Sequence, residues 1–105
     1  MQATEQILQL IKKSILVSAP DATLILYGSY ARGDFNEGSD IDLLVLLNQD
    51  KVTYDDRVRI AYPLYDIQYD NGILISPMVC SKAVWENKYA ATPFYENVIK
   101  EGVVL

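Results

Sequence analysis

The feature that most constrains this chain is a Gly28-Ser29 pair separated by ten residues from Asp40-Ile41-Asp42. An apolar run at 24–27 precedes the glycine, and a second apolar run at 41–47 contains the later aspartate. Such runs are typical of buried strands, so both parts of the motif fall where strands meet loops. Because side chains alternate along a strand, Asp40 and Asp42 are expected on one face, roughly 6 to 7 Å apart. Two carboxylates in this arrangement can bind a divalent cation between them.

Gly28 and Ser29 have the properties that a phosphate group requires. Glycine lets the backbone turn tightly and approach a ligand closely. Ser29 and the amides beside it offer hydrogen-bond donors to phosphate oxygens. Together with the two carboxylates, the pair predicts a cleft for a nucleotide and its metal ion.

The residues from Gly28 to Asp34, GSYARGD, and from Ser39 to Val45, SDIDLLV, resemble the signature of minimal nucleotidyltransferases in the DNA polymerase beta superfamily. A weaker resemblance extends from about residue 4 to the carboxyl end. It implies one α+β domain over residues 1–105, a small mixed β-sheet with helices packed against it, which is the nucleotidyltransferase (polymerase beta-like palm) fold.

The resemblance also implies roles for individual residues. Asp40 and Asp42 would be catalytic ligands of Mg²⁺, while Gly28 and Ser29 would hold the phosphates of the substrate ATP. Arg32 would lie nearby and could bind phosphate as well. Since its loop is rich in acids, Arg32 could instead pair with Asp34 or Glu37.

The chain departs from the family at a third carboxylate, which relatives usually carry on the next strand as the general base. Alignment places Ser76, or its neighbours Ile75 and Pro77, at that position. Asp66 or Asp70 could replace the acid only if that stretch formed a strand beside the second one. Loss of the base is expected to cost on the order of a hundredfold in rate.

Two functions follow from these observations. As an enzyme, the chain would transfer a nucleoside monophosphate from ATP to a hydroxyl and release pyrophosphate. The resemblance implies that a small helical HEPN protein is the partner, a toxin whose tyrosine is modified by this antitoxin. The alternative is a weak or inactive module that neutralises a helical partner by binding. Aromatic residues that could anchor that partner, although core or boundary packing is favoured for each, are Tyr54, Tyr62, Tyr65, Tyr69, Trp85, Tyr89 and Tyr95.

Composition narrows the classes of partner. Fourteen acidic and nine basic residues give a formal net charge of −5, so the chain lacks the basic face that long nucleic acid requires. The single Cys80 has no histidine to activate it and lies in an apolar run, as a buried structural thiol does. Without a signal peptide or a long apolar run, we expect a cytoplasmic protein that does not enter membranes. Homo-oligomerisation is left open.

Periodicity and capping residues predict the order of elements. Thr4 is expected to cap the first helix, Pro63 to kink or divide the central helix, and Pro77 to place its strand at an edge. The predicted elements are a helix ending at Ser18, a strand at 23–27, a helical turn at 29–32, a strand at 41–47, a helix at about 54–70, a strand at 73–80, a helix starting at Ser81, a helix opened by Thr92-Pro93 that runs to Gly102, and an apolar tail at 103–105.

Overall fold

A computed structural model describes residues 2–105, in which five helices and four strands follow one another. The strands are β1 (Thr23–Tyr27), β2 (Ile41–Leu47), β3 (Ile75–Ser81) and β4 (Val103–Val104). The helices are α1 (Gln2–Ser18), α2 (Ser29–Arg32), α3 (Tyr54–Asn71), α4 (Lys82–Asn87) and α5 (Pro93–Glu101).

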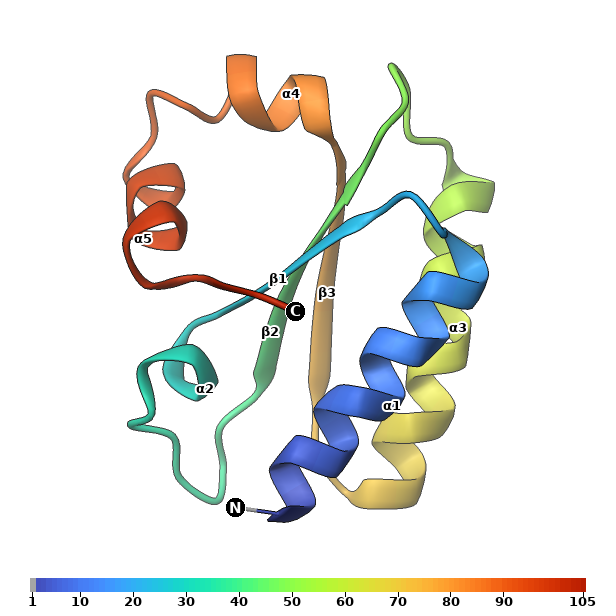
Figure 1. The fold of residues 1–105 in the computed structure, drawn as a ribbon, viewed down its shortest axis with the longest axis vertical. Coiled ribbons are helices and arrows are strands. Elements are labelled where there is room, and N and C mark those ends of the chain that lie inside the picture. The colour runs from blue at the N-terminus through green and yellow to red at the C-terminus, as the bar shows by residue number, and fades with distance from the viewer. Residues whose placement is uncertain (1) are drawn as a thin grey trace.

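The four strands form one mixed sheet in the order β3-β2-β1-β4 (Figure 1). β1 is antiparallel to β2 and to β4, whereas β2 and β3 are parallel. The predicted α+β class with a small mixed sheet is therefore confirmed. β3 is an edge strand, as Pro77 predicted, because an edge has one side on which a missing N–H costs no ladder bond.

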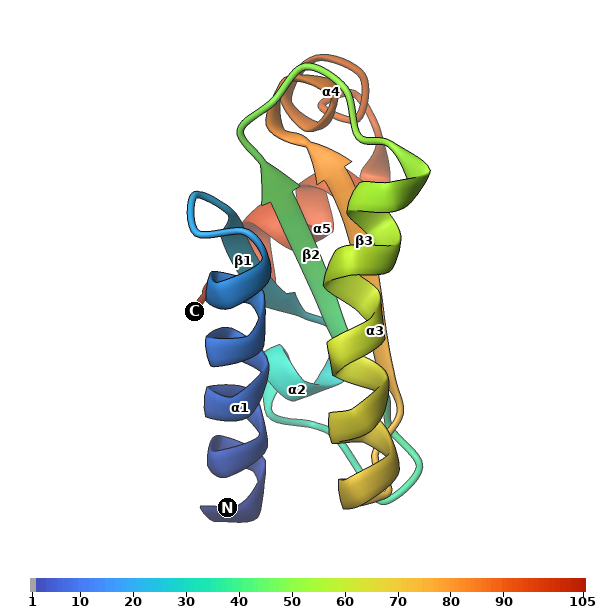
Figure 2. The ribbon, with the colours of Figure 1, turned by 90° about the vertical axis from the view of Figure 1, so that its right-hand side faces the viewer.

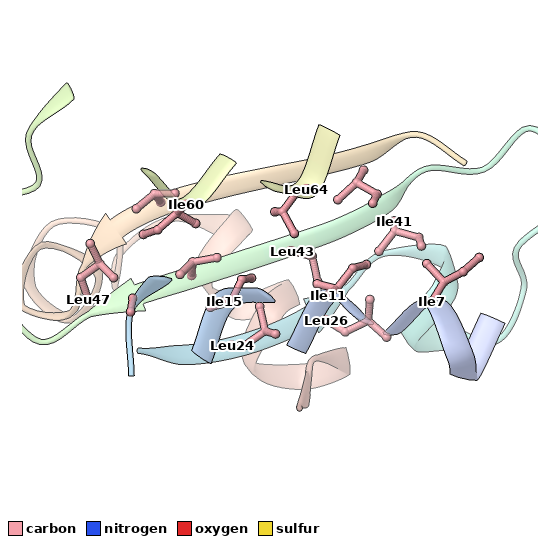
Figure 3. Close-up of a cluster of buried hydrophobic side chains, with 14 residues drawn as sticks. Ile7, Ile11, Ile15, Leu24, Leu26, Ile41, Leu43, Leu47, Ile60 and Leu64 are labelled. Atoms are coloured by element: carbon pink, nitrogen blue, oxygen red, sulfur yellow. The ribbon is translucent and has the colours of Figure 1, made fainter. Parts of the chain in front are cut away.

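One face of the sheet is covered by α1 and α3, which lie next to each other in Figure 2. Ile7, Ile11 and Ile15 recur at helical spacing and are buried on the inner side of α1. Figure 3 shows them meeting Ile60 and Leu64 of α3 above the sheet. The sheet residues of this core are Leu24, Leu26, Ile41, Leu43, Val45, Leu47, Ile75 and Val79.

The opposite face packs against α4 and α5 and is rich in aromatic side chains. Leu44 and Leu46 alternate with the residues of the first core and contact this second one. Trp85 of α4 is buried, and its ring centroid lies 4.9 Å from that of Tyr95 and 5.8 Å from that of Phe94. The buried Cys80 belongs to the same cluster, which confirms its predicted structural role.

The central helix is continuous. Of the two expected effects of Pro63, a kink or a division into two short helices, the division is therefore wrong. α3 passes through Pro63 and buries Ile60 and Leu64 on either side of it. Because proline has no N–H, the carbonyl of Arg59 lacks its hydrogen bond within the helix. Arg59 is exposed, so a water molecule can donate to this carbonyl instead. Packing on both sides of the proline therefore keeps the helix in one piece.

Both ends of α3 have local causes in the sequence. Thr53 Oγ1 accepts from the Asp56 N–H at 3.1 Å, and Asp56 Oδ2 accepts from the Thr53 N–H at 2.9 Å, which makes a reciprocal capping box. Gly72 ends the helix in the left-handed conformation, with φ of 64°, as predicted.

Two further expectations are wrong. Thr4 lies inside α1, which starts at Gln2, so Thr4 is not its cap. The predicted apolar tail is instead β4, which pairs with Ile25 and Leu26 of β1. A two-residue strand carries no periodicity of its own and exists only because β1 offers a free edge.

The aromatic residues divide between the two faces. Trp85, Tyr89 and Tyr95 pack within the α4–α5 cluster, which confirms the favoured interpretation for these three. The tyrosines of α3 are exposed instead, with exposed fractions of 78% for Tyr54, 65% for Tyr62, 51% for Tyr65 and 89% for Tyr69. Among the described residues, no helix combines the length and apolar character needed to cross a bilayer.

Candidate nucleotide and metal site

The two parts of the sequence motif meet at one end of the β1–β2 pair. Tyr27, the last residue of β1, pairs with Asp42 near the start of β2, so Gly28 follows directly beside the aspartate. Gly28 has φ of 77°, and a Cβ added there would lie 2.5 Å from Asp42 Oδ2. The backbone therefore reaches the carboxylate only because residue 28 has no side chain.

The short helix α2 starts immediately after this turn. The backbone N–H groups of Ala31 and Arg32 donate to the Gly28 carbonyl at 3.1 and 3.0 Å, which closes the turn. Among the described residues, the half-buried Ser29 hydroxyl has no hydrogen-bond partner. Ser29 is thus available as a donor to an anion at the same end of the sheet as Asp42.

Asp40 and Asp42 form a concentration of negative charge. Strand alternation places Asp42 on the face of Leu44 and Leu46, toward the α4–α5 side. Burial, and then the charge of Asp40, raise the pKa of the Asp42 carboxyl, while Arg32 opposes them. Burial and Asp42 also raise the pKa of the Tyr27 phenol. The charge on Asp42 is therefore costly in the free protein.

Carboxylate oxygens are the donors that Mg²⁺ prefers, and this ion often takes only one or two from protein. Among residues 4–105, whose side chains the structure describes, neither Asp40 nor Asp42 accepts a side-chain hydrogen bond, so their oxygens are available to bind a cation. No group of three or more acidic, histidine or cysteine side chains that could hold a metal occurs within this range. The donor set fits an ion that completes its shell with water and nucleotide phosphates.

Arg32 of α2 is held by two acids. Its Nε donates to Asp34 Oδ2 at 3.1 Å, and its Nη1 donates to both carboxylate oxygens of Glu101 at 3.2 Å. The predicted pairing with Asp34 is therefore present. Glu101, at the end of α5, was not foreseen as a partner, while Glu37 lies exposed in the loop.

Ser76 lies where the resemblance led us to expect the third carboxylate. The parallel pairing of β2 with β3 sets Ser76 beside Asp42, as the alignment predicted. Asp66 and Asp70 do not replace the missing acid, because both are exposed on α3 and no strand forms there. That alternative is wrong: the spacing of Ile60, Leu64 and Ile67 buries them as a helix against the sheet.

The sequence from residue 6 to residue 104 matches the family described as the nucleotidyltransferase domain. The chain belongs to the nucleotidyltransferase domain family. The expectation of a nucleotidyltransferase enzyme is thereby confirmed, and nucleotidyl transfer is its type of reaction. The family match spans the candidate site, both core faces and all of β4.

Two curated relatives come from Methanocaldococcus jannaschii, and each carries the name "putative protein adenylyltransferase". One is 35% identical over 102 residues, which cover 93% of this nucleotidyltransferase and 94% of the relative. The other is 39% identical over 82 residues, which cover 78% and 75%. The likeness therefore extends over nearly the whole length of the first relative.

Solved structures share the fold at lower identity. A chain in a crystal structure of a toxin-antitoxin with AMP-PNP superposes with a TM-score of 0.65 at 22% identity, covering 91% of this chain and 69% of that one. A "putative nucleotidyltransferase" from Sulfolobus solfataricus gives a TM-score of 0.54 at 20% identity, with coverages of 99% and 86%. The nucleotidyltransferase fold is thereby confirmed.

Sequence reasoning missed two neighbours of the site in this nucleotidyltransferase. Tyr27 was read only as part of a buried strand, although its pairing with Asp42 follows from the antiparallel register. Glu101 is 69 residues from Arg32, and no local pattern connects them. An acid in the last turn of a helix is unfavourable for the helix dipole, which is the one sequence signal that could have drawn attention to it.

Proposed function

We propose that this nucleotidyltransferase uses Mg²⁺ and ATP to attach AMP to a hydroxyl of a partner protein. In this reaction the hydroxyl oxygen bonds to the α-phosphorus, the bond to pyrophosphate breaks, and the hydroxyl loses its proton. The observation that carries the proposal is the contact of Gly28 with the Asp42 carboxylate, because it joins the phosphate-binding turn to the metal ligands.

Each residue of the site has a proposed role. Asp40 and Asp42 hold the metal ion, which when bound neutralises charge on the phosphates and the leaving pyrophosphate. Gly28 allows the phosphates to approach the backbone, and Ser29 donates a hydrogen bond to them. Arg32 supplies positive charge beside the same phosphates. The acidic site then binds the nucleotide together with its cation.

A tyrosine is the proposed acceptor, because a site without a third carboxylate needs an acidic hydroxyl. Ser76, which stands beside Asp42, is a poor base for deprotonating a hydroxyl. A phenol has a pKa of about 10 and loses its proton far more readily than the hydroxyl of serine. The name of the adenylyltransferase relatives supports a protein acceptor. A chain of the same fold occurs in a toxin-antitoxin structure, which supports a toxin as that protein. The sequence resemblance to minimal nucleotidyltransferases is the basis for proposing a small helical HEPN protein as this toxin.

The experiment is label transfer from α-labelled ATP to a purified HEPN partner, with and without Mg²⁺. We expect label on the partner only with metal, and loss of label with Asp42→Asn. Asp50→Asn is the matched control, since it removes one exposed aspartate at the other end of β2. Equal labelling by the Asp42 variant would contradict the assignment of the site, and label from γ-labelled ATP would contradict the reaction.

Because Ser76, and not a carboxylate, lies beside Asp42, a second candidate function is a module that neutralises its partner by binding alone. Tyr62, Tyr65 and Tyr69 would then serve as exposed anchors along α3, where the rings of the first two lie 5.9 Å apart. Under this alternative, the Asp40→Asn/Asp42→Asn double variant would still neutralise the toxin in cells. Under the enzyme proposal, the same variant would not neutralise it.

A further inference from the structure

We propose that Glu101 is a positioning residue that orients the Arg32 guanidinium toward the nucleotide phosphates. The inference deepens the proposed function, since it rests on nucleotide binding at the turn that begins at Gly28. Glu101 would touch neither nucleotide nor metal and would act through Arg32 alone.

Two of the three nitrogens of the Arg32 guanidinium donate hydrogen bonds to acids. Nη1 donates to both carboxylate oxygens of Glu101 at 3.2 Å, and Nε donates to Asp34 Oδ2 at 3.1 Å. The guanidinium is planar and carries its donors in a rigid fork, so fixing two nitrogens fixes the third. Among residues 4–105, whose side chains the structure describes, Nη2 has no acceptor. The arginine therefore presents a preset donor to an incoming anion.

The backbone of Arg32 lies close to the candidate phosphate site. The N–H of Arg32 donates to the Gly28 carbonyl at 3.0 Å, so the arginine stands one helical turn after the glycine. Ser29 starts the same turn of helix. A flexible arginine at this place would lose side-chain freedom on binding nucleotide, and the two acids remove much of that freedom beforehand.

The backbone that follows Glu101 is tightly packed. The next residue is Gly102, where a Cβ would overlap the Val98 carbonyl oxygen and lie 2.8 Å from Ile25 Cγ2. β4 then pairs with β1, the strand that ends at Tyr27, directly before Gly28. The side chain of Glu101 is 25% exposed, against 61% for Asp34. Glu101 is thus the firmer of the two supports, and it is anchored to the strand that carries the motif.

The test is the dissociation constant of ATP with Mg²⁺, measured by calorimetry, together with KM and kcat for label transfer. The variants are Glu101→Ala, Glu101→Gln, Arg32→Ala and the Arg32→Ala/Glu101→Ala double variant. Glu96→Ala, which removes an exposed acid from the first turn of the same helix, is the control. The melting temperature of each variant shows that it is folded.

We expect Glu101→Ala to weaken ATP binding and raise KM about two- to tenfold with kcat nearly unchanged. Glu101→Gln keeps one acceptor for Nη1 and should fall between wild type and Glu101→Ala. In the Arg32→Ala background, loss of Glu101 should have no further effect, because its action passes through the arginine. A merely structural contact would lower the melting temperature without this dependence on Arg32.

Three results would overturn the inference. The first is an equal loss of affinity from Glu101→Ala with and without Arg32. The second is tighter ATP binding by Glu101→Ala, which would mean that Glu101 withholds the arginine. The third is unchanged affinity in Glu101→Ala while Arg32→Ala binds more weakly. Failure of the proposed function gives another result, namely no label transfer by the wild-type protein. The dissociation constants of ATP for the variants would then still decide the role of Glu101.

Discussion

At the scale of single residues, the contact between Gly28 and Asp42 sets the strictest requirement. Gly28→Ala would place a methyl group 2.5 Å from Asp42 Oδ2 in a backbone conformation that side chains rarely adopt. We expect a loss of about 1–3 kcal/mol in the free energy of unfolding, with loss of nucleotide binding. Gly38→Ala is the control, because its Cβ would have only Asn36 Oδ1 at 3.8 Å. Urea denaturation measures the stability of the two variants. Equal midpoints for Gly28→Ala and Gly38→Ala would contradict the requirement for glycine at position 28.

The charge of the Asp42 carboxylate lowers the stability of the metal-free protein, whereas nucleotidyl transfer requires that charge. Burial and Asp40 raise the pKa of its carboxyl, so the charged form at neutral pH is unfavourable in the folded state. We expect Asp42→Asn to raise the melting temperature of the metal-free protein at pH 7 while it lowers transfer by a hundredfold or more. Calorimetric melting and label transfer measure the two effects. A variant that melts lower and remains active would contradict both parts.

At the scale of elements, the capping box of α3 makes stability depend on pH. Hydrogen bonds, first from the Thr53 N–H and then from Arg59, lower the pKa of Asp56 to about 2. Since the unfolded carboxyl titrates near 3.8, the contribution of Asp56 is fully present above that pH and disappears as the pH falls through about 2. Urea midpoints between pH 5 and 2 should fall less steeply for Asp56→Asn than for wild type.

The matched control for this pH dependence is Asp55→Asn, which removes the neighbouring charge but no hydrogen bond of the cap. Its urea midpoints should follow those of wild type. Thr53→Ala should cost about 1 kcal/mol at neutral pH through loss of the same cap. A profile for Asp56→Asn that is as steep as wild type would show that other carboxyls dominate acid unfolding.

Elements whose cause is local could be predicted from the sequence. The strands at 23–27 and 41–47 and the helix opened by Thr92-Pro93 appear where they were expected. The helix expected to start at Ser81 starts one residue later, at Lys82, and Ser81 is its cap. Elements whose cause is distant could not. β4 depends on the free edge of β1, and the continuity of α3 depends on packing around Pro63. The candidate site follows the same rule. The place of Asp42 was predictable from strand pattern and that of Ser76 from the resemblance to the family, whereas the contact of Glu101 with Arg32 was not predictable.

At the scale of the whole molecule, the sheet joins two cores that should unfold together. Leu43 lies in the core under α1 and α3, and its neighbour Leu44 lies in the core under α4 and α5. Because both side chains leave the same strand, we expect either change to alanine to cost about 2–5 kcal/mol and to leave one transition. The single Trp85 reports fluorescence from the second core alone. A fluorescence midpoint that differs from the circular dichroism midpoint would contradict this cooperativity.

The register that pairs Tyr27 with Asp42 also decides where the chain can change length. One residue inserted into β2 after Asp42 would turn the following side chains to the opposite faces, or else turn the aspartate into the core under α1 and α3. The loop at 33–40 carries no ladder pairing, and its lengthening costs little because closure entropy grows slowly. Tolerance to insertion therefore ends abruptly at Asp40, where a loop without ladder pairing is followed by a strand that permits no additional residue.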